Sequence, residues 1–224
     1  MTNQKETTSL IMRYAGKMLR THFGKGPEVL SVSLDHRSLV LHMKKFITPI
    51  EDALLAKKDE KTFRYTRELM MKALVPELET FVREELHLNP MSLYYDWNLE
   101  NSSGAIVVLF DAEADMHETY ENKEGVHEQI VEVLTKTQAK PSTIESWWVD
   151  SKTLLIFRTG IAILLEKELH ALGYTDILKT VKRKLEKEML WEQAGIGRVL
   201  HRPMADLYID WNFDRDDSVI VCRF

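Results

Sequence analysis

Residues 94–98 read Tyr-Tyr-Asp-Trp-Asn, and residues 208–212 repeat this stretch as Tyr-Ile-Asp-Trp-Asn. The aspartates of the two copies, Asp96 and Asp210, are 114 positions apart, and so are the tryptophans. A polar interval follows each copy, and an apolar run rich in valine and isoleucine comes next, at 105–108 and at 219–222. Short apolar runs separated by turn residues are typical of antiparallel strands. The chain therefore carries a predicted strand, turn and strand unit twice.

The segments that precede the first copy predict a helix and then two strands. Apolar residues with helical spacing cover about residues 8–23, and Gly24 and Pro27 follow as a helix stop. Alternating apolar residues then predict strands at about 28–34 and 38–45.

Two more helices are predicted before the hairpin at about 91–111. Thr48 can cap a helix, Pro49 fits its first position, and Glu51 can return a capping-box hydrogen bond. A longer amphipathic helix follows at about 62–86. Pro76 lies inside it and lacks a backbone N–H, so we predict a kink or a restarted helix near Val75.

The second half repeats this order. We predict a helix at 123–137, a hairpin at 143–159, helices within 162–201 and a last hairpin at 206–224. The fold class is α+β, with two tandem α-β-β-α-β-β repeats at 1–112 and 121–224 and an acidic linker at 113–120. Each repeat should form a four-stranded antiparallel sheet with helices packed on it. The repeats should be related by a pseudo-twofold axis and pack as an intramolecular pseudo-dimer.

Composition excludes several classes of protein. The 224 residues carry a net charge of −5, and the basic residues are mixed with acidic ones, so we predict no nucleic-acid partner. No apolar stretch approaches the roughly 20 residues of a membrane-spanning helix, and the first residues do not resemble a signal peptide. The single Cys222 lies in an apolar run and should be buried. We expect a cytoplasmic protein, peripheral to the membrane only through a partner.

The two copies also supply the main candidate site. Strand alternation puts Leu93, Tyr95, Trp97 and Leu99 on a core face, with Leu207, Ile209, Trp211 and Phe213 as their counterparts. The opposite row could line a ligand-binding groove or an interface, and it consists of Tyr94, Asp96, Asn98, Tyr208, Asp210 and Asn212. The structural alternative is that the Asp and Asn side chains hold the hairpin turns, and we favour it. An acid/base pair would require Asp96 and Asp210 to converge with shifted pKa values.

Other polar residues have simpler explanations. His36 and Arg37 fall at a predicted hairpin tip, where solvation is the simple interpretation and partner recognition the alternative. Arg64 and Arg67 are predicted to lie on a solvated helix face with surface ion pairs, or to form a docking surface. The set His117, Glu118, Glu121, His127 and Glu128 matches no metal-binding spacing, so we predict no metal and no cofactor. No nucleophile motif or phosphate-binding loop is present.

Three motifs resemble the bacterial MpsC-like family over about residues 8–111. They are Gly24-Lys25-Gly26-Pro27, Thr48-Pro49-Ile50-Glu51 and the stretch Ala73-Leu74-Val75-Pro76-Glu77-Leu78. In the second half, Gly160-Ile161-Ala162-Ile163 stands where the Thr-Pro-x-Glu motif is expected, and no Pro-Glu-Leu occurs.

The resemblance implies a protein associated with a membrane ion-translocating or inorganic-carbon uptake system, and it supplies no catalytic residues. We therefore predict a non-enzymatic accessory or regulatory interaction protein with a protein partner, such as a membrane transport complex. The alternative is a small-ligand or nucleotide sensor with its pocket between the repeats, and an enzyme is the third choice.

Overall fold

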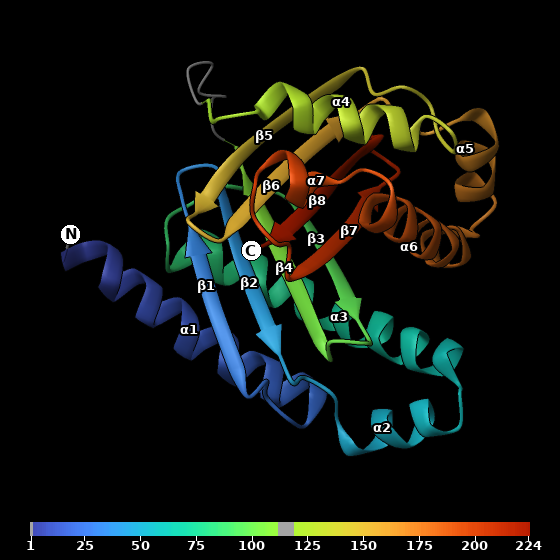
Figure 1. The fold of residues 1–224 in the computed structure, drawn as a ribbon. Helices are drawn as coiled ribbons and strands as arrows, with labels where there is room; N and C mark the ends of the chain where they lie inside the picture. Colours follow the sequence, from blue (N-terminus) through green and yellow to red (C-terminus); the bar gives the residue numbers. More distant parts are fainter. Residues whose placement is uncertain (1, 112–118) are drawn as a thin grey trace. The chain divides into compact units, whose positions relative to one another are not determined.

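The computed structural model describes residues 2–111 and 119–224 (Figure 1). The predicted acidic linker at 113–120 falls mostly outside the described residues. The chain divides into two compact units, 1–93 with 97–113, and 94–96 with 114–224. The first three residues of the stretch 94–98, Tyr94–Asp96, therefore group with the second unit.

The first half contains a four-stranded sheet in the order β1-β2-β4-β3. The strand β2 pairs antiparallel with β1 and with β4. The elements are α1 (Thr2–Phe23), β1 (Val29–Leu34), β2 (Ser38–Lys44), α2 (Pro49–Ala56), α3 (Glu60–Glu84), β3 (Pro90–Asn98) and β4 (Ser103–Phe110).

The second half contains a four-stranded sheet in the same order, β5-β6-β8-β7, and its printed pairings are antiparallel. The elements are α4 (Lys123–Leu134), β5 (Thr143–Asp150), β6 (Thr153–Thr159), α5 (Leu164–Ala171), α6 (Thr175–Glu192), α7 (Ile196–Val199), β7 (Asp206–Asn212) and β8 (Asp217–Arg223). The α+β class and the two repeat-like halves are confirmed. The pseudo-twofold relation stays a prediction.

Of the two alternatives predicted for Pro76, helix α3 excludes the restarted helix, and the kink stays a prediction. The helix runs without interruption from Glu60 to Glu84, so no second helix begins near Val75. The helix tolerates the missing N–H of Pro76 within one continuous element. The predicted capping box of α2 is confirmed, because Glu51 N–H donates to Thr48 Oγ1 and Thr48 N–H donates to Glu51 Oε2 at 2.8 Å.

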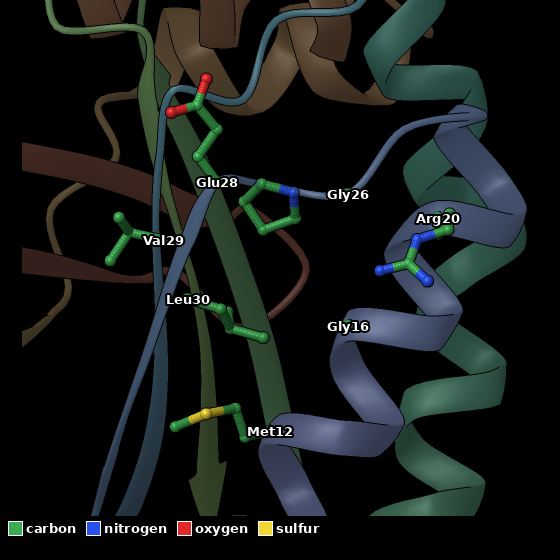
Figure 2. A pocket seen from close by; sticks show the side chains of 8 residues that line it. Met12, Gly16, Arg20, Gly26, Glu28, Val29 and Leu30 are labelled. Atoms are coloured by element: carbon green, nitrogen blue, oxygen red, sulfur yellow. The ribbon is translucent and has the colours of Figure 1, made fainter.

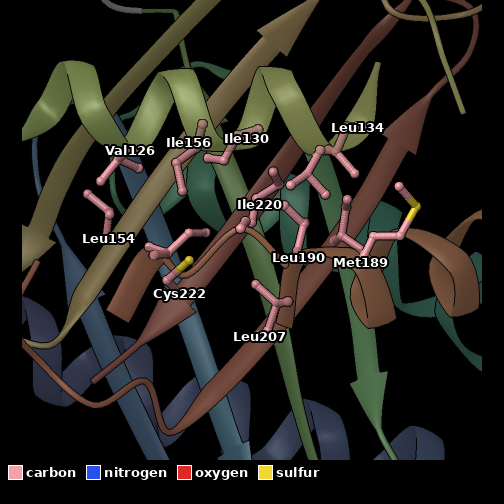
Figure 3. Close-up of a cluster of buried hydrophobic side chains, with 14 of the residues drawn as sticks. Val126, Ile130, Leu134, Leu154, Ile156, Met189, Leu190, Leu207, Ile220 and Cys222 are labelled. Carbon is pink, nitrogen blue, oxygen red and sulfur yellow. The ribbon is translucent and has the colours of Figure 1, made fainter. Parts of the chain in front are cut away.

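Each half has an apolar core anchored by the predicted tryptophan. Trp97 is buried and lies 6.0 Å, between ring centroids, from both Phe23 and Phe46. In the second half, Trp211 and Cys222 belong to a buried cluster that joins α4 and α6 to strands β6, β7 and β8 (Figure 3). Burial raises the pKa of the Cys222 thiol to about 12, which agrees with the predicted role of a small buried side chain.

The first helices of the two halves bury equivalent residues. Four core positions of α1 reappear in α4 after a constant interval of 115 residues. Ile11, Ala15, Met18 and Leu19 of α1 correspond to Val126, Ile130, Val133 and Leu134 of α4, and all eight are buried. The interval of 115 residues therefore aligns the helices of the two halves.

Candidate functional site

The structure places the two Tyr-Asp-Trp-Asn stretches in buried surroundings. Tyr94 and Asp96 are buried in β3, whereas Leu93 and Tyr95 are only half-buried. The predicted core face is therefore wrong for the first part of β3, although it is right for Trp97. In β7, both faces are buried from Asp206 to Trp211. The side chains of Tyr94, Asp96, Tyr208 and Asp210 thus line no open groove.

Asp96 and Asp210 converge within the second unit through a reciprocal arrangement. The Ile209 N–H donates to Asp96 Oδ2 at 2.9 Å, and the Tyr95 N–H donates to Asp210 Oδ2 at 3.0 Å. Arg183 of α6 joins the two carboxylates, with Nε 3.2 Å from Asp96 Oδ1 and Nη2 2.9 Å from Asp210 Oδ1. Each aspartate therefore accepts a hydrogen bond from the backbone N–H of the residue that precedes the other aspartate in the chain.

Two lysines of α6 add further ion pairs to the two carboxylates. Lys187 Nζ lies 2.5 Å from Asp96 Oδ2, and Lys179 Nζ lies 3.0 Å from Asp210 Oδ1. Burial alone would raise the pKa of Asp210, but Lys179, Arg183 and the Tyr95 N–H outweigh it and lower this pKa. A general acid at neutral pH needs a raised pKa, so Asp210 has the opposite property. The arrangement suits a structural role, in which buried ion pairs hold α6 to β3 and β7.

The remaining residues of the two stretches have separate roles. Asn98 Oδ1 accepts the Glu100 N–H at 3.1 Å, and Asn212 Oδ1 accepts the Arg215 N–H at 3.2 Å. The predicted turn-holding role is therefore right for the asparagines and wrong for Asp96 and Asp210, whose carboxylates reach other strands and α6. The Tyr94 hydroxyl donates to Asp217 Oδ1 at 2.6 Å, and the Tyr208 hydroxyl donates to Asp206 Oδ2 at 2.7 Å.

Arg67 is buried, which contradicts the prediction of a solvated helix face. Its Nε donates to Glu51 Oε1 at 2.7 Å, and its Nη2 donates to Glu51 Oε2 at 2.9 Å and to the Phe46 carbonyl. Burial opposes ionisation of Glu51, but the bonds from Arg67 lower its pKa. Four aromatic rings surround the Arg67 guanidinium, with centroids 4.2–5.5 Å from Cζ, and they belong to Trp97, Phe63, Phe46 and Phe23.

The second half keeps this arrangement with different residues. Glu166 and Lys182 lie 115 positions after Glu51 and Arg67, and Lys182 Nζ lies 2.6 Å from Glu166 Oε1. Lys182 also lies 5.5 Å from the centroid of the Trp211 ring. Glu166 Oε2 accepts the Ile163 N–H, so the counterpart of the Thr-Pro-x-Glu motif is residues 163–166. The assignment to 160–163 was wrong because it overlooked Glu166.

The other predicted candidates stay separate from these clusters. His36 is exposed at the turn between β1 and β2, where Asp35 Oδ1 accepts the Arg37 N–H at 2.8 Å. Arg64 forms a pair with Glu60 one helical turn away, as predicted for a surface helix. Asp35 therefore gives the hairpin tip a structural explanation, because it holds the turn through the Arg37 backbone.

The predicted acidic and histidine-rich set is only partly described. His117 and Glu118 lie outside the described residues. His127 Nε2 lies 2.7 Å from Ser146 Oγ, and burial lowers the pKa of His127. In the parts of the chain that the structure describes, no three His, Cys, Asp or Glu side chains form a group that could hold a metal ion.

The helix α6 exposes an apolar stripe that the sequence reasoning missed. Tyr174, which precedes the helix, and Ile177, Val181 and Leu185 follow helical spacing, and all four are exposed. We name these four residues the α6 stripe. The buried residues of the same helix include Lys182, Arg183 and Glu186. More exposed apolar side chains lie on or next to α5, at Leu164, Leu165 and Leu172.

A pocket between α1 and β1 was also not predicted (Figure 2). It has a volume of about 350 Å³ and is lined by Met12, Gly16, Arg20, Gly26, Pro27, Glu28, Val29 and Leu30. Gly16 and Gly26 contribute no side chains to the lining, so these two glycines near the predicted strand at 28–34 were the sequence signal for the pocket.

Comparison with known protein families matches the first half of the chain. Residues 3–112 match a family model described as "Na+-translocating membrane potential-generating system (MpsC)", which confirms the resemblance over the first half. No curated protein and no solved structure gives a significant match. Within the described residues, no helix combines the length and the apolar character needed to cross a bilayer.

Proposed function

Because residues 3–112 of this chain belong to the MpsC family, we propose that the protein is a non-enzymatic accessory subunit of a membrane ion-translocating system. It would act from the cytoplasmic side and reach the membrane through a protein partner. The family description supports the association with ion translocation. The surface chemistry of the second half supports an interaction role.

The observation that carries this proposal is the α6 stripe. Ile177 is 64% exposed and Val181 is 57% exposed, and both lie one helical turn apart on α6. Contiguous apolar side chains on a protein surface mark interaction sites, because their burial in a partner removes apolar area from water. The exposed Leu164 and Leu165 of α5 add to the apolar surface of this helical region.

The buried charges also fit an interaction protein better than an acid/base enzyme. Cationic side chains lie 2.5–3.2 Å from the carboxylates of Asp96, Asp210 and Glu51. Such pairs fix the fold and leave these carboxylates poorly placed to exchange protons with a substrate.

Co-purification from detergent-solubilised membranes of the source cell tests the proposal. The tagged wild-type protein should recover subunits of an ion-translocating complex, identified by mass spectrometry. The double variant Ile177→Thr/Val181→Thr should recover at least about fivefold less, because loss of the apolar contacts weakens a central anchor by about 1 kcal/mol or more.

The matched control is Tyr65→Thr/Leu69→Thr, which changes two exposed apolar residues one turn apart on α3. This control should retain recovery. Equal losses in the two double variants would indicate non-specific hydrophobic capture, and recovery without any ion-translocating subunit would reject the proposed association.

A further inference from the structure

The pocket between α1 and β1 is open because of residues particular to the first half. A Cβ atom at Gly16 would lie 3.9 Å from Leu30 Cδ2, and one at Gly26 would have no neighbour closer than 3.6 Å. Both positions therefore have room for a side chain. Figure 2 shows the space between α1 and β1, with Met12 and Leu30 reaching toward it.

The second half carries a larger side chain at the position equivalent to Gly16. At the positions 115 residues after Met12 and Gly16 stand His127 and Val131. His127 bonds Ser146 of β5 at 2.7 Å, which ties the helix α4 to that strand. The first half has glycine in place of Val131 and keeps the pocket open.

An unpaired cation faces this pocket. The Arg20 guanidinium lies beside Gly26, because a Cβ there would be 3.6 Å from Nε and 3.7 Å from Nη2. Arg20 has no hydrogen-bond or ion-pair partner among residues 2–111 and 119–224. Glu28, the one carboxylate of the lining, lies 3.0 Å from Lys45 Nζ. The pocket therefore presents a positive group without a counter-charge.

The wall of the pocket is an edge strand. In the described part of the chain, β1 ends its sheet and has β2 as its one neighbouring strand. The outer edge of such a strand offers N–H and C=O groups to an added strand. Val29 is 48% exposed and Met12 is 41% exposed, so apolar contacts are also open beside this edge.

We propose that this pocket binds an extended acidic segment of a partner protein, which adds as a strand to the free edge of β1. Main-chain hydrogen bonds to β1 supply affinity, Arg20 pairs with a glutamate or aspartate of the segment, and Met12 and Val29 receive an apolar neighbour. The charge of Arg20 selects an acidic occupant. The inference does not depend on the α6 stripe or on the identity of the membrane system.

A peptide titration followed by NMR tests the proposal on the ¹⁵N-labelled full chain. The probes are acetylated and amidated eight-residue peptides that alternate valine and threonine, in a pair that differs by one central glutamate or glutamine. The glutamate peptide should shift the amide signals of Val29–Leu34 saturably. It should bind at least about tenfold tighter than the glutamine peptide, because the glutamine peptide cannot form the charge-assisted hydrogen bond to Arg20.

Three variants sharpen the test. Arg20→Glu should reduce binding of the glutamate peptide about tenfold or more, and Arg20→Lys should retain part of it. Gly16→Val places in α1 the residue found at the equivalent position of α4, and it should block the pocket while preserving the circular dichroism melt. Lys17→Glu is the matched control, since Lys17 is exposed on the same helix and lies outside the pocket lining.

Several outcomes would overturn the proposal. Equal losses from Lys17→Glu and Arg20→Glu would indicate general attraction to anions, as would tighter binding to vesicles with anionic lipid than to the peptides. Equal affinity for the two peptides, or no saturable binding by either, would show that Arg20 does not select an acidic strand. Dimerisation that perturbs the β1 amides would assign the edge to a second copy of the chain.

Discussion

The long helices α3 and α6 follow equivalent elements of the two halves, and α6 buries more charged side chains than α3 does. The buried residues of α3 are apolar except for Arg67, whereas α6 buries Lys182, Arg183 and Glu186 and exposes Ile177 and Val181. The partners opposite each helix explain the difference, because α6 meets the carboxylates of Asp96, Asp210 and Glu166. At the interval of 115 residues the same face is buried in both helices, as Phe63 with Leu178 and Arg67 with Lys182 show, so the partners decide only which residue types that face carries.

Buried charge fixes which face of α6 points inward, because an unpaired ion inside a protein costs several kcal/mol. Arg183 contacts the carboxylates of both Asp96 and Asp210. A rotation of α6 that exposed Arg183 would leave both aspartates without this partner. In α3 the single ion pair to Glu51 is surrounded by aromatic rings, which leaves room for an ordinary apolar face. Substitutions in α3 and α6 test this difference between the two helices.

Loss of the one buried charge of α3 should have the largest effect. We expect Arg67→Ala to reduce the free energy of unfolding by about 3–5 kcal/mol, because Glu51 loses its cation and the aromatic rings lose their central contact. Urea unfolding followed by circular dichroism measures the loss. The control Arg64→Ala removes a partly exposed one-turn pair and should cost about 0.5 kcal/mol or less. Similar costs for both variants would mean that the buried pair contributes no more than a surface pair.

The fold could be predicted from local signals, whereas the buried charges could not. The capping box at Thr48 and the repeated hairpin sequences depend on residues close together in the chain, so they are visible without a structure. The bond from Arg183 to Asp96 joins residues 87 positions apart, and no periodicity indicates it. Helical spacing alone would assign Ile177 and Val181 to a core, because a stripe does not reveal what faces it.

The pocket shows a different limit of sequence reasoning. Gly16 lies within a helical pattern and by itself indicates only a weaker helix. Its meaning depends on the alignment of α1 with α4 by the interval of 115 residues, whereas the repeated hairpins suggest 114. With the interval of 115, Gly16 corresponds to Val131 and Glu51 to Glu166. The two halves can then be compared residue by residue.

Removal of one charge from the α6 cluster should have an intermediate effect. We expect Asp210→Asn to cost about 2 kcal/mol at pH 7, because asparagine keeps the shape but leaves Lys179 and Arg183 with one carboxylate fewer. The control is Asp214→Asn, which changes an exposed aspartate. If both variants reduced the free energy of unfolding by similar amounts, the buried aspartate Asp210 would contribute no more than an exposed one. Urea melts of the two variants decide between these outcomes.

The same variant has a predicted pH dependence. The folded-state pKa of Asp210 is lowered from its ordinary value of 3.8, so the ionised carboxylate contributes its full stabilisation above about pH 4. This stabilisation is lost as the pH falls from 3.8 through the folded-state pKa. The difference between wild type and Asp210→Asn should therefore narrow in urea melts below pH 4, and a constant difference would contradict the ionic role.

Exchange of the exposed stripe for its counterpart in α3 should have the smallest effect on stability. Thr62 and Thr66 of α3 precede Ile177 and Val181 by 115 residues, so Ile177→Thr/Val181→Thr gives α6 the polar surface of α3. We expect the free energy of unfolding to change by about 0.5 kcal/mol or less, because both side chains lie mostly in water and only buried apolar area stabilises the fold. A loss of 2 kcal/mol or more in urea unfolding would mean that the stripe is part of the core. Retained stability with reduced partner recovery would separate the stripe, which serves a partner, from the buried charges that hold α6 in place.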